Sequence, residues 1–244
     1  MKRLVKYVLL ITFIGVLGVI VGALFQGVSP YDLYRVSKTV IRERIDCKTV
    51  EERIADIEKL RPELIDVAVG TKMAILVFKQ ERRVEMFADA WNSPKIYQMK
   101  GFSGELGPKL TEGDGQIPEG VYGIEYMNPN SMFYLSLKVD YPNEFDRVKA
   151  AVDGRTKLGG DIMIHGGTAS SGCVPVGDEG IEEMFYFVGK IGYENVTVVI
   201  SPYDMRRGRR ADLEVSNVPW YQECCNIIDK ELAKIHMQPK SLKR

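Results

Sequence analysis

The sequence is poor in histidine, has no surplus of either charge, and lacks paired-cysteine metal motifs. Lys and Arg number 33 and Asp and Glu also 33, so the formal net charge is zero, whereas nucleic-acid-binding proteins usually carry a basic surplus. The four cysteines show neither a CxxC nor a Cys/His ligand spacing, which argues against zinc. The 45% hydrophobic and 27% charged composition is typical of a globular protein. We therefore expect one globular domain with appendages, and no nucleic-acid partner.

The N-terminus carries a signal for membrane insertion. Basic residues within positions 1–6 precede an uncharged run from Tyr7 to Phe25, which at ~1.5 Å per residue matches the roughly 30 Å hydrocarbon core of a bilayer. The basic flank predicts a cytoplasmic tail at 1–6 and an extracytoplasmic chain after Gln26. We therefore expect 7–25 to be an uncleaved transmembrane signal anchor. The alternative is a cleaved signal peptide, for which Gly22–Ala23 is a poor cleavage site.

Hydrophobic spacing divides the remaining chain into three parts. Residues 29–65 have apolar side chains at three- and four-residue steps, which predicts a juxtamembrane helical segment ended by Pro62. From 66 to 203 short strands alternate with Gly- and Pro-rich turns, a pattern typical of a mainly β catalytic domain. Residues 204–244 read as a linker and an amphipathic helix over Tyr221–Ile235. The strands expected in the domain are Met73–Phe78, Arg83–Phe87, Ile96–Gly101, Val121–Tyr126, Phe133–Val139, Asp161–His165 and Val196–Ser201, with a helix over Glu179–Val188.

An oxidising compartment would allow some of the cysteines to pair. Cys47 could bridge to Cys224 or to Cys225, which cannot easily bond to each other because they are adjacent in the chain. Cys173 would stay outside such a pairing and keep the thiol that a nucleophile needs.

Cys173 follows one of the two histidines by eight residues, in the segment DIMIHGGTASSGCVPVG (161–177). An apolar strand ends at His165, and two glycines and a small-residue loop lead to the cysteine. Thiolate is the nucleophilic form of cysteine, and a nearby imidazole can take the thiol proton. A Ser-Gly-Cys turn can also direct successive backbone N–H groups at one oxyanion. The alternative is that Cys173 is a small buried hydrophobe and His165 a structural residue, and the residues alone leave both interpretations open.

The stretch IHGGTASSGC (164–173) resembles the signature of the YkuD-type L,D-transpeptidase catalytic domain, which is His-Gly, a spacer, and Ser-x-Gly-Cys. Its short spacer is similar to that of the YafK-like branch. Further segments resemble that branch in the same order, and the last of them matches the helix after the nucleophile. These are GPKLTEGDGQIPEGVYGI (Gly107–Ile124), DYPNEFDRV (Asp140–Val148), KLGGDIMIHGG (Lys157–Gly167) and DEGIEEMFYFV (Asp178–Val188). The resemblance covers about 66–203 and implies a β-sandwich of mixed sheets with a short helix after the nucleophile.

The resemblance implies a role for each matching residue. Cys173 matches the acylated nucleophile and His165 its base. A backbone carbonyl at Gly166 or Gly167 matches the group that orients the imidazole. The N–H groups of Ser171, Gly172 and Cys173 match the oxyanion hole. No metal or organic cofactor is implied.

The sequence departs from the common family pattern at two positions. Ser171 stands where most members have His or Thr, and Pro175 stands where most have an Arg that contacts a substrate carboxylate. Arg155 or Lys109 could supply the missing cation, with a surface role as the alternative. Two aromatic residues are candidate pocket walls, with core packing as the alternative; they are Tyr122 and Tyr141.

The resemblance also implies a reaction on peptidoglycan. Cys173 would attack the carbonyl that joins the diamino acid of a stem peptide to its terminal D-alanine, and would pass the acyl group to an amine of another stem or of an envelope protein. Water as the acceptor would instead make the protein a peptidoglycan hydrolase, and a non-catalytic peptidoglycan-binding module is a third interpretation. With the expected anchor, the protein would be a single-pass protein of the bacterial cytoplasmic membrane with a periplasmic catalytic domain.

Overall fold

The computed structural model describes residues 47–208 and 216–236. The chain divides into two units, Met1–Cys47 and Lys48–Arg244, and the fold below belongs to the second. The expected cytoplasmic tail, the signal anchor at 7–25 and the juxtamembrane residues 29–46 lie outside the described residues. In the two described ranges no helix is both long and apolar enough to cross a bilayer.

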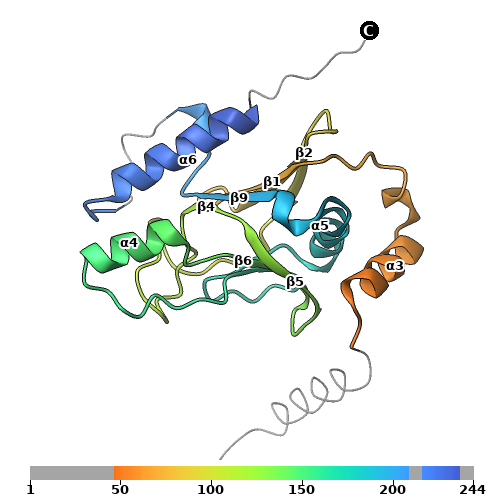
Figure 1. The fold of residues 1–244 in the computed structure, drawn as a ribbon, viewed down its shortest axis with the longest axis horizontal. Helices are drawn as coiled ribbons and strands as arrows, with labels where there is room; N and C mark the ends of the chain where they lie inside the picture. Colours follow the sequence, from red (N-terminus) through yellow and green to blue (C-terminus); the bar gives the residue numbers. More distant parts are fainter. Residues whose placement is uncertain (1–46, 209–215, 237–244) are drawn as a thin grey trace, which may run out of the picture. The chain divides into compact units, whose positions relative to one another are not determined.

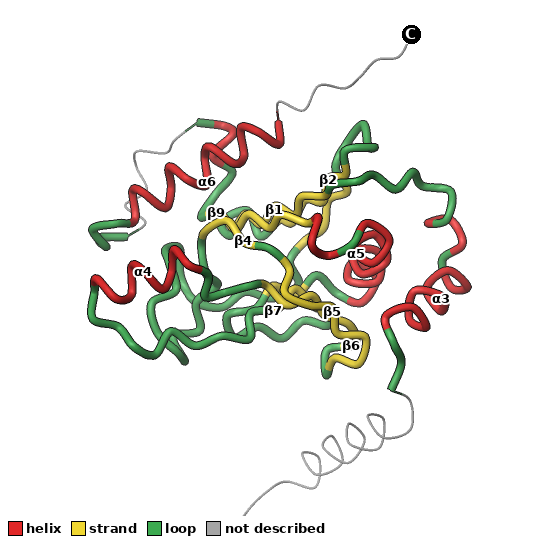
Figure 2. The backbone as a smooth tube through the Cα atoms, viewed as in Figure 1, coloured by secondary structure: helices red, strands yellow, loops and turns green. Residues whose placement is uncertain are grey.

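Two mixed β-sheets form the body of the domain, as the resemblance implied (Figures 1 and 2). The five-stranded sheet has the order β3-β2-β1-β9-β4, in which β1 pairs parallel with β9 and antiparallel with β2. The four-stranded sheet has the order β5-β6-β7-β8, in which only β7 and β8 are parallel. The strands are β1 (Met73–Phe78), β2 (Arg83–Ala88), β3 (Lys95–Gln98), β4 (Gly120–Tyr122), β5 (Ile124–Ser131), β6 (Tyr134–Val139), β7 (Met163–His165), β8 (Val174–Pro175) and β9 (Val196–Ser201).

The continuous apolar run of β1 is explained by its position at the centre of the five-stranded sheet. All six of its residues are buried. Ile75 and Val77 belong to one core cluster, and Ala74, Leu76 and Phe78 belong to the other. Alternate side chains of a strand point to opposite faces, so this sheet is covered on both sides. Helix α6 (Tyr221–His236) packs on the face that carries the second cluster (Figure 1).

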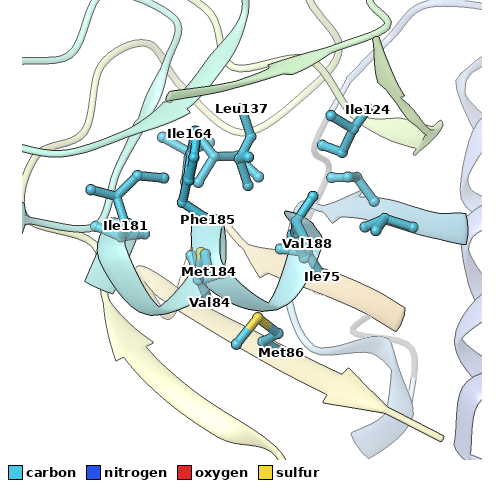
Figure 3. Packing of buried hydrophobic residues seen from close by; sticks show 14 of the residues in the cluster. Ile75, Val84, Met86, Ile124, Leu137, Ile164, Ile181, Met184, Phe185 and Val188 are labelled. Carbon is cyan, nitrogen blue, oxygen red and sulfur yellow. The ribbon is translucent and has the colours of Figure 1, made fainter. Parts of the chain in front are cut away.

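Helix α5 (Asp178–Ile191) lies between the two sheets (Figure 3). Its buried apolar side chains contact strands of both sheets, and each such side chain contributes roughly 1.5–3 kcal/mol by burial. The predicted helix after the cysteine is therefore confirmed, although it is longer than expected and belongs to the central core. Figure 3 labels Ile181, Met184, Phe185 and Val188 of α5 together with the strand residues Ile75, Val84, Met86, Ile124, Leu137 and Ile164 of the same core cluster.

The remaining helices flank the sheets. Helix α3 (Val50–Leu60) begins at a capping box formed by Thr49 and Glu52 and ends before Pro62, as predicted for this end of the 29–65 segment. Helix α4 (Glu144–Val152), capped by Asn143, was not predicted from the hydrophobic pattern. The described residues also include three short 3-10 helices, at Pro62–Leu64, Tyr193–Asn195 and Met205–Arg207.

The predicted strand Val121–Tyr126 was wrong, because the chain changes sheets in its middle. β4 ends at Tyr122 and β5 begins at Ile124, with Gly123 between them. The Gly123 N–H donates to the Asp140 carboxylate at 2.9 Å, and a Cβ at Gly123 would lie 3.6 Å from that carboxylate. The prediction for Ile96–Gly101 was also too long at its end, since β3 stops at Gln98.

Cys224 lies in the first turn of α6 as a buried free thiol, and its Sγ donates to the carbonyl oxygen of Glu119 at 3.4 Å. The expected bridge from Cys47 to Cys224 is therefore not formed. A bridge from Cys47 to Cys225 stays a prediction.

Candidate active site

Strand pairing brings His165 and Cys173 to neighbouring strands of the four-stranded sheet. His165 is the last residue of β7, and Cys173 immediately precedes β8. The parallel register pairs Ile164 with Val174, and both side chains point into the core cluster that contains α5. Because side chains alternate along a strand, His165 and Cys173 point to the opposite face of the sheet. The eight-residue loop thus returns the cysteine to the strand next to the histidine. The two residues lie diagonally, about 4.8 Å apart across the strands and two residues apart along them, because the register sets Cys173 beside Met163 and His165 beside Pro175.

The His165 imidazole is held in one tautomer. Its Nδ1 lies 2.5 Å from the carbonyl oxygen of Gly166, and a carbonyl can only accept, so the proton resides on Nδ1 and Nε2 carries the lone pair. The ring is 1% exposed and stacks on Phe133 at 4.4 Å between ring centroids. Burial lowers the pKa of His165, and the Gly166 carbonyl opposes that shift. The imidazole is therefore neutral near pH 7 and chemically suited to act as a base.

The Nε2 atom of His165 has no hydrogen-bond partner among the described residues, and it keeps only a small accessible surface because the whole residue is 1% exposed. Among the described residues, one fully buried side-chain nitrogen or oxygen atom lacks a hydrogen-bond partner, and it is Oε2 of Glu81. Nε2 of His165 makes no hydrogen bond in that part of the chain either, so it must retain accessible surface. An open lone pair next to a thiol can accept the thiol proton.

The two glycines after His165 are favoured for different reasons, Gly166 by the lack of space for a side chain and Gly167 by its positive φ. A Cβ at Gly166 would lie 2.7 Å from the Phe133 carbonyl oxygen and 2.6 Å from Oδ1 of Asp178. Gly167 adopts a φ of +66° and donates its N–H to the same Asp178 oxygen at 2.8 Å. Asp178, the first residue of α5, therefore braces the loop after the histidine. This role was not predicted from the sequence, although Asp178 was expected at the start of the helix after the nucleophile.

Cys173 is a half-buried thiol with one hydrogen-bond acceptor. Its Sγ donates to the carbonyl oxygen of Asp161 at 3.5 Å. Burial raises the pKa of Cys173, while a hydrogen bond from the Met163 backbone and, more weakly, the charges of Lys138 and Lys109 lower it. In the described part of the chain no hydrogen bond joins Sγ to His165, so the resting site holds a neutral thiol beside a neutral imidazole. Such catalytic hydrogen bonds often form only when substrate binds.

The turn before Cys173 is fixed by two serines that the sequence analysis missed. The Gly172 N–H donates to Ser103 Oγ at 2.7 Å, Ser103 and Ser170 hydroxyls lie 2.9 Å apart, and Ser170 Oγ donates to the Cys173 carbonyl at 2.8 Å. Because Ser170 donates to Cys173, Ser103 must donate to Ser170, so every proton in this chain points the same way. The Gly172 N–H is thereby occupied and is not open to an oxyanion in this arrangement. The N–H groups of Ser171 and Cys173 have no acceptor among the described residues.

A cavity of about 700 Å³ lies near the proposed nucleophile, although neither Cys173 nor His165 is among the residues that line it. It reaches Asp161, whose carbonyl oxygen accepts the Cys173 thiol. Tyr141 is among the residues that line this cavity, but it is also buried in the main core cluster, so both interpretations of it stay open. Tyr122 is buried with its hydroxyl on the Glu119 carbonyl oxygen at 3.1 Å and does not line the cavity, which matches its alternative role in core packing.

Neither predicted replacement for the missing arginine reaches the cavity. Arg155 donates to Asp153 and to the carbonyl oxygen of Leu110, and it stacks over Trp220. Lys109 is held by Asp114 at 2.5 Å. Both cations are therefore engaged elsewhere.

No group of three His, Cys, Asp or Glu side chains within the described ranges is arranged to hold a metal ion.

Comparison with known proteins agrees with the resemblance. The family model for the L,D-transpeptidase catalytic domain (YkuD) matches residues 72–200. YafK of Escherichia coli K12, named provisionally as an L,D-transpeptidase, is 31% identical over 144 residues, which are 57% of this chain and 56% of YafK. YafK of Escherichia coli O157:H7 gives the same values. This chain thus spans about half the length of these curated relatives.

Two solved structures show a more distant likeness. The helical cell shape determining protein Pgp2 from Campylobacter jejuni is 20% identical with a TM-score of 0.43, over 64% of this chain and 56% of Pgp2. Bd1075 from Bdellovibrio bacteriovorus is 21% identical with a TM-score of 0.38, over 69% of this chain and 56% of Bd1075.

Proposed function

Because this chain belongs to the L,D-transpeptidase catalytic domain (YkuD) family, we propose that it is an acyltransferase whose acyl-enzyme forms on Cys173. The proposed donor is a peptidoglycan stem peptide. The observation that carries the proposal is the tautomer and position of the His165 imidazole. Its proton is held on Nδ1 by the Gly166 carbonyl, and its open Nε2 lies on the strand next to the thiol.

The first half-reaction transfers the acyl group to the enzyme. The Cys173 thiol rotates from the Asp161 carbonyl toward His165, and Nε2 takes its proton as Sγ bonds to the scissile carbonyl carbon. The N–H groups of Ser171 and Cys173 are the available donors for the resulting oxyanion. The imidazolium then returns the proton to the departing amine as the C–N bond breaks. The Gly166 carbonyl stabilises the transient imidazolium through Nδ1.

The second half-reaction moves the acyl group to an acceptor. An amine of another stem, or of an envelope protein, loses its proton to His165 as it attacks the thioester, and the thiol is regenerated. Water in the same place would make the protein a peptidoglycan hydrolase. The partial exposure of Cys173 supports this second candidate, because an open thioester admits water. Incubation with purified muropeptides distinguishes the two, since cross-linked products indicate transfer and shortened peptides alone indicate hydrolysis.

The proposed substrate requires an extracytoplasmic domain. The basic flank and the uncharged run at 7–25 support a single-pass anchor in the cytoplasmic membrane, with residues 66–203 as the catalytic domain on its outer side. Protease digestion of intact spheroplasts tests this topology, because an outward-facing domain is degraded and a cytoplasmic one is protected.

A carbapenem tests the nucleophile without the natural substrate. Its strained amide should acylate Cys173, giving one adduct that peptide mass mapping assigns to this residue. Cys173→Ala should give none, and His165→Gln should slow the reaction by about 100-fold or more, the usual range for a lost general base. An intact protein that gives no adduct, or an adduct at another cysteine, would favour a non-catalytic peptidoglycan-binding module.

A further inference from the structure

Lys138 carries an ammonium group that the described residues leave without a hydrogen bond. It lies on β6 with its side chain 8% exposed. Its nearest carboxylates are Glu125 at 3.5 Å and Asp161 at 3.8 Å, and their side chains are 56% and 91% exposed. Lys138 Nζ is not among the fully buried atoms that lack a hydrogen-bond partner, so it keeps some accessible surface, and Lys138 is one of the residues that line the cavity. A buried lysine stem whose ammonium makes only two long ion pairs, both to exposed carboxylates, keeps hydrogen-bond donors for a further anion.

The other buried lysines are satisfied within the fold. Lys79 donates to two backbone carbonyls and pairs with Glu119 at 2.8 Å. Lys109 donates to Asp114 and to the carbonyl oxygen of Thr111. Burying an ammonium costs several kcal/mol unless partners compensate it. Lys138 is the one of these three whose compensation is incomplete, which points to a ligand.

Lys138 lies on the same sheet face as the proposed nucleophile. It pairs with Met163 on β7, and the parallel register of β7 and β8, continued by one residue, sets Met163 beside Cys173. The two residues are therefore two strands apart, about 10 Å between backbones. The lysine side chain spans much of that distance, and its charge lowers the pKa of Cys173.

We propose that Lys138 recognises a carboxylate of the substrate, namely the one that ends the residue expelled from the scissile bond. This inference rests on the proposed acyl transfer at Cys173. One residue extends about 3.5 Å along a peptide, so the terminal carboxylate lies close to the scissile carbonyl and within reach of a neighbouring ammonium. On binding, the substrate carboxylate replaces the loose contacts to Glu125 and Asp161, whose exposed side chains turn toward water. Lys138 thereby supplies the cation that the sequence lacks at Pro175.

The test compares two stem tetrapeptides that differ only at the C-terminus, one a free carboxylate and one a carboxamide. The wild-type protein should prefer the carboxylate by about 10- to 100-fold in kcat/KM, the range of a charge-assisted hydrogen bond. Lys138→Met, which keeps the buried stem, should abolish the preference, and Lys138→Arg should retain part of it. Lys109→Met is the matched control, since Lys109 also lowers the pKa of Cys173 but does not line the cavity, so the preference should persist.

A binding measurement separates this inference from the proposed reaction. Cys173→Ala protein should bind the carboxylate peptide more tightly than the carboxamide by calorimetry, and the difference should vanish in the Cys173→Ala, Lys138→Met protein. If turnover and carbapenem labelling fail while this difference remains, the reaction is refuted and the subsite stands. Equal binding of both peptides by Cys173→Ala protein, or an unchanged preference in Lys138→Met, overturns the subsite. Tighter binding of the carboxamide also overturns it, and would indicate that Asp140 and Glu144 in the cavity wall repel anions.

Discussion

Replacing Ser103 by alanine removes the residue that ties a distant loop to the turn before the nucleophile. The change breaks the 2.7 Å bond from the Gly172 N–H and the 2.9 Å contact with Ser170. Each hydrogen bond contributes about 0.5–1.5 kcal/mol, so the loss is about 1–3 kcal/mol before water replaces part of it. If half of this holds Cys173 in its reactive position, kcat/KM for acylation should fall by roughly 3- to 10-fold.

The rate of carbapenem acylation of Cys173, followed by intact-protein mass spectrometry, measures this effect. Ser171→Ala is the matched control, because the exposed Ser171 side chain makes no hydrogen bond within the described ranges and its backbone N–H is kept. Ser103→Thr retains the hydroxyl and should recover most of the rate. Thermal unfolding of each variant separates lost positioning from lost folding. Equal acylation rates for folded Ser103→Ala and Ser171→Ala would refute the reasoning.

Three further perturbations follow from buried groups. Phe133→Ala removes the ring stacked on His165, so the imidazole pKa should rise toward its ordinary value and the acid limb of the acylation rate should move to higher pH; an unmoved limb would contradict the burial argument. Burial raises the pKa of Asp146 from 3.8 to about 6, so the folded state binds this proton more tightly and stability from this group is lost as pH rises from about 4 to 6. The unfolding free energy of wild type relative to Asp146→Asn should fall by about 2–3 kcal/mol over that window in urea titrations, and a flat difference would count against it. Lys79→Met leaves the Glu119 carboxylate buried without its cation and should cost about 3–5 kcal/mol in the same assay, whereas removing both charges should restore much of it.

The elements predicted well from sequence are those whose hydrophobic pattern has one explanation. Met73–Phe78 and Val196–Ser201 were located to the residue, because central strands covered on both faces favour mostly apolar runs. Helix α5 was found because its apolar residues recur at helical spacing. Helix α4 was missed because only Ala150 and Asp146 are buried along it, so its capping box was a better signal than its hydrophobicity.

The residues of the candidate site also fall into those that the sequence could predict and those that it could not. Cys173 and His165 were identified because they belong to one local segment, and the parallel pairing of β7 and β8 supplies their proximity. Ser103 could not be found, since it lies 69 residues from the glycine that it binds. Lys138 was hidden for a different reason. A single lysine in an alternating strand normally marks the solvent side, and sequence does not reveal that this side is enclosed.

The position of Asp178 has a consequence for how this protein can change over evolution. The helix that begins at this residue fills the space between the two sheets, while its first carboxylate holds the loop that orients His165. A change in how α5 packs in the interior would therefore also move the Asp178 carboxylate, which holds the loop after His165. Variants that repack this helix would be selected on reactivity as well as on stability, and moving the short Cys–His loop alone onto another scaffold would leave its support behind.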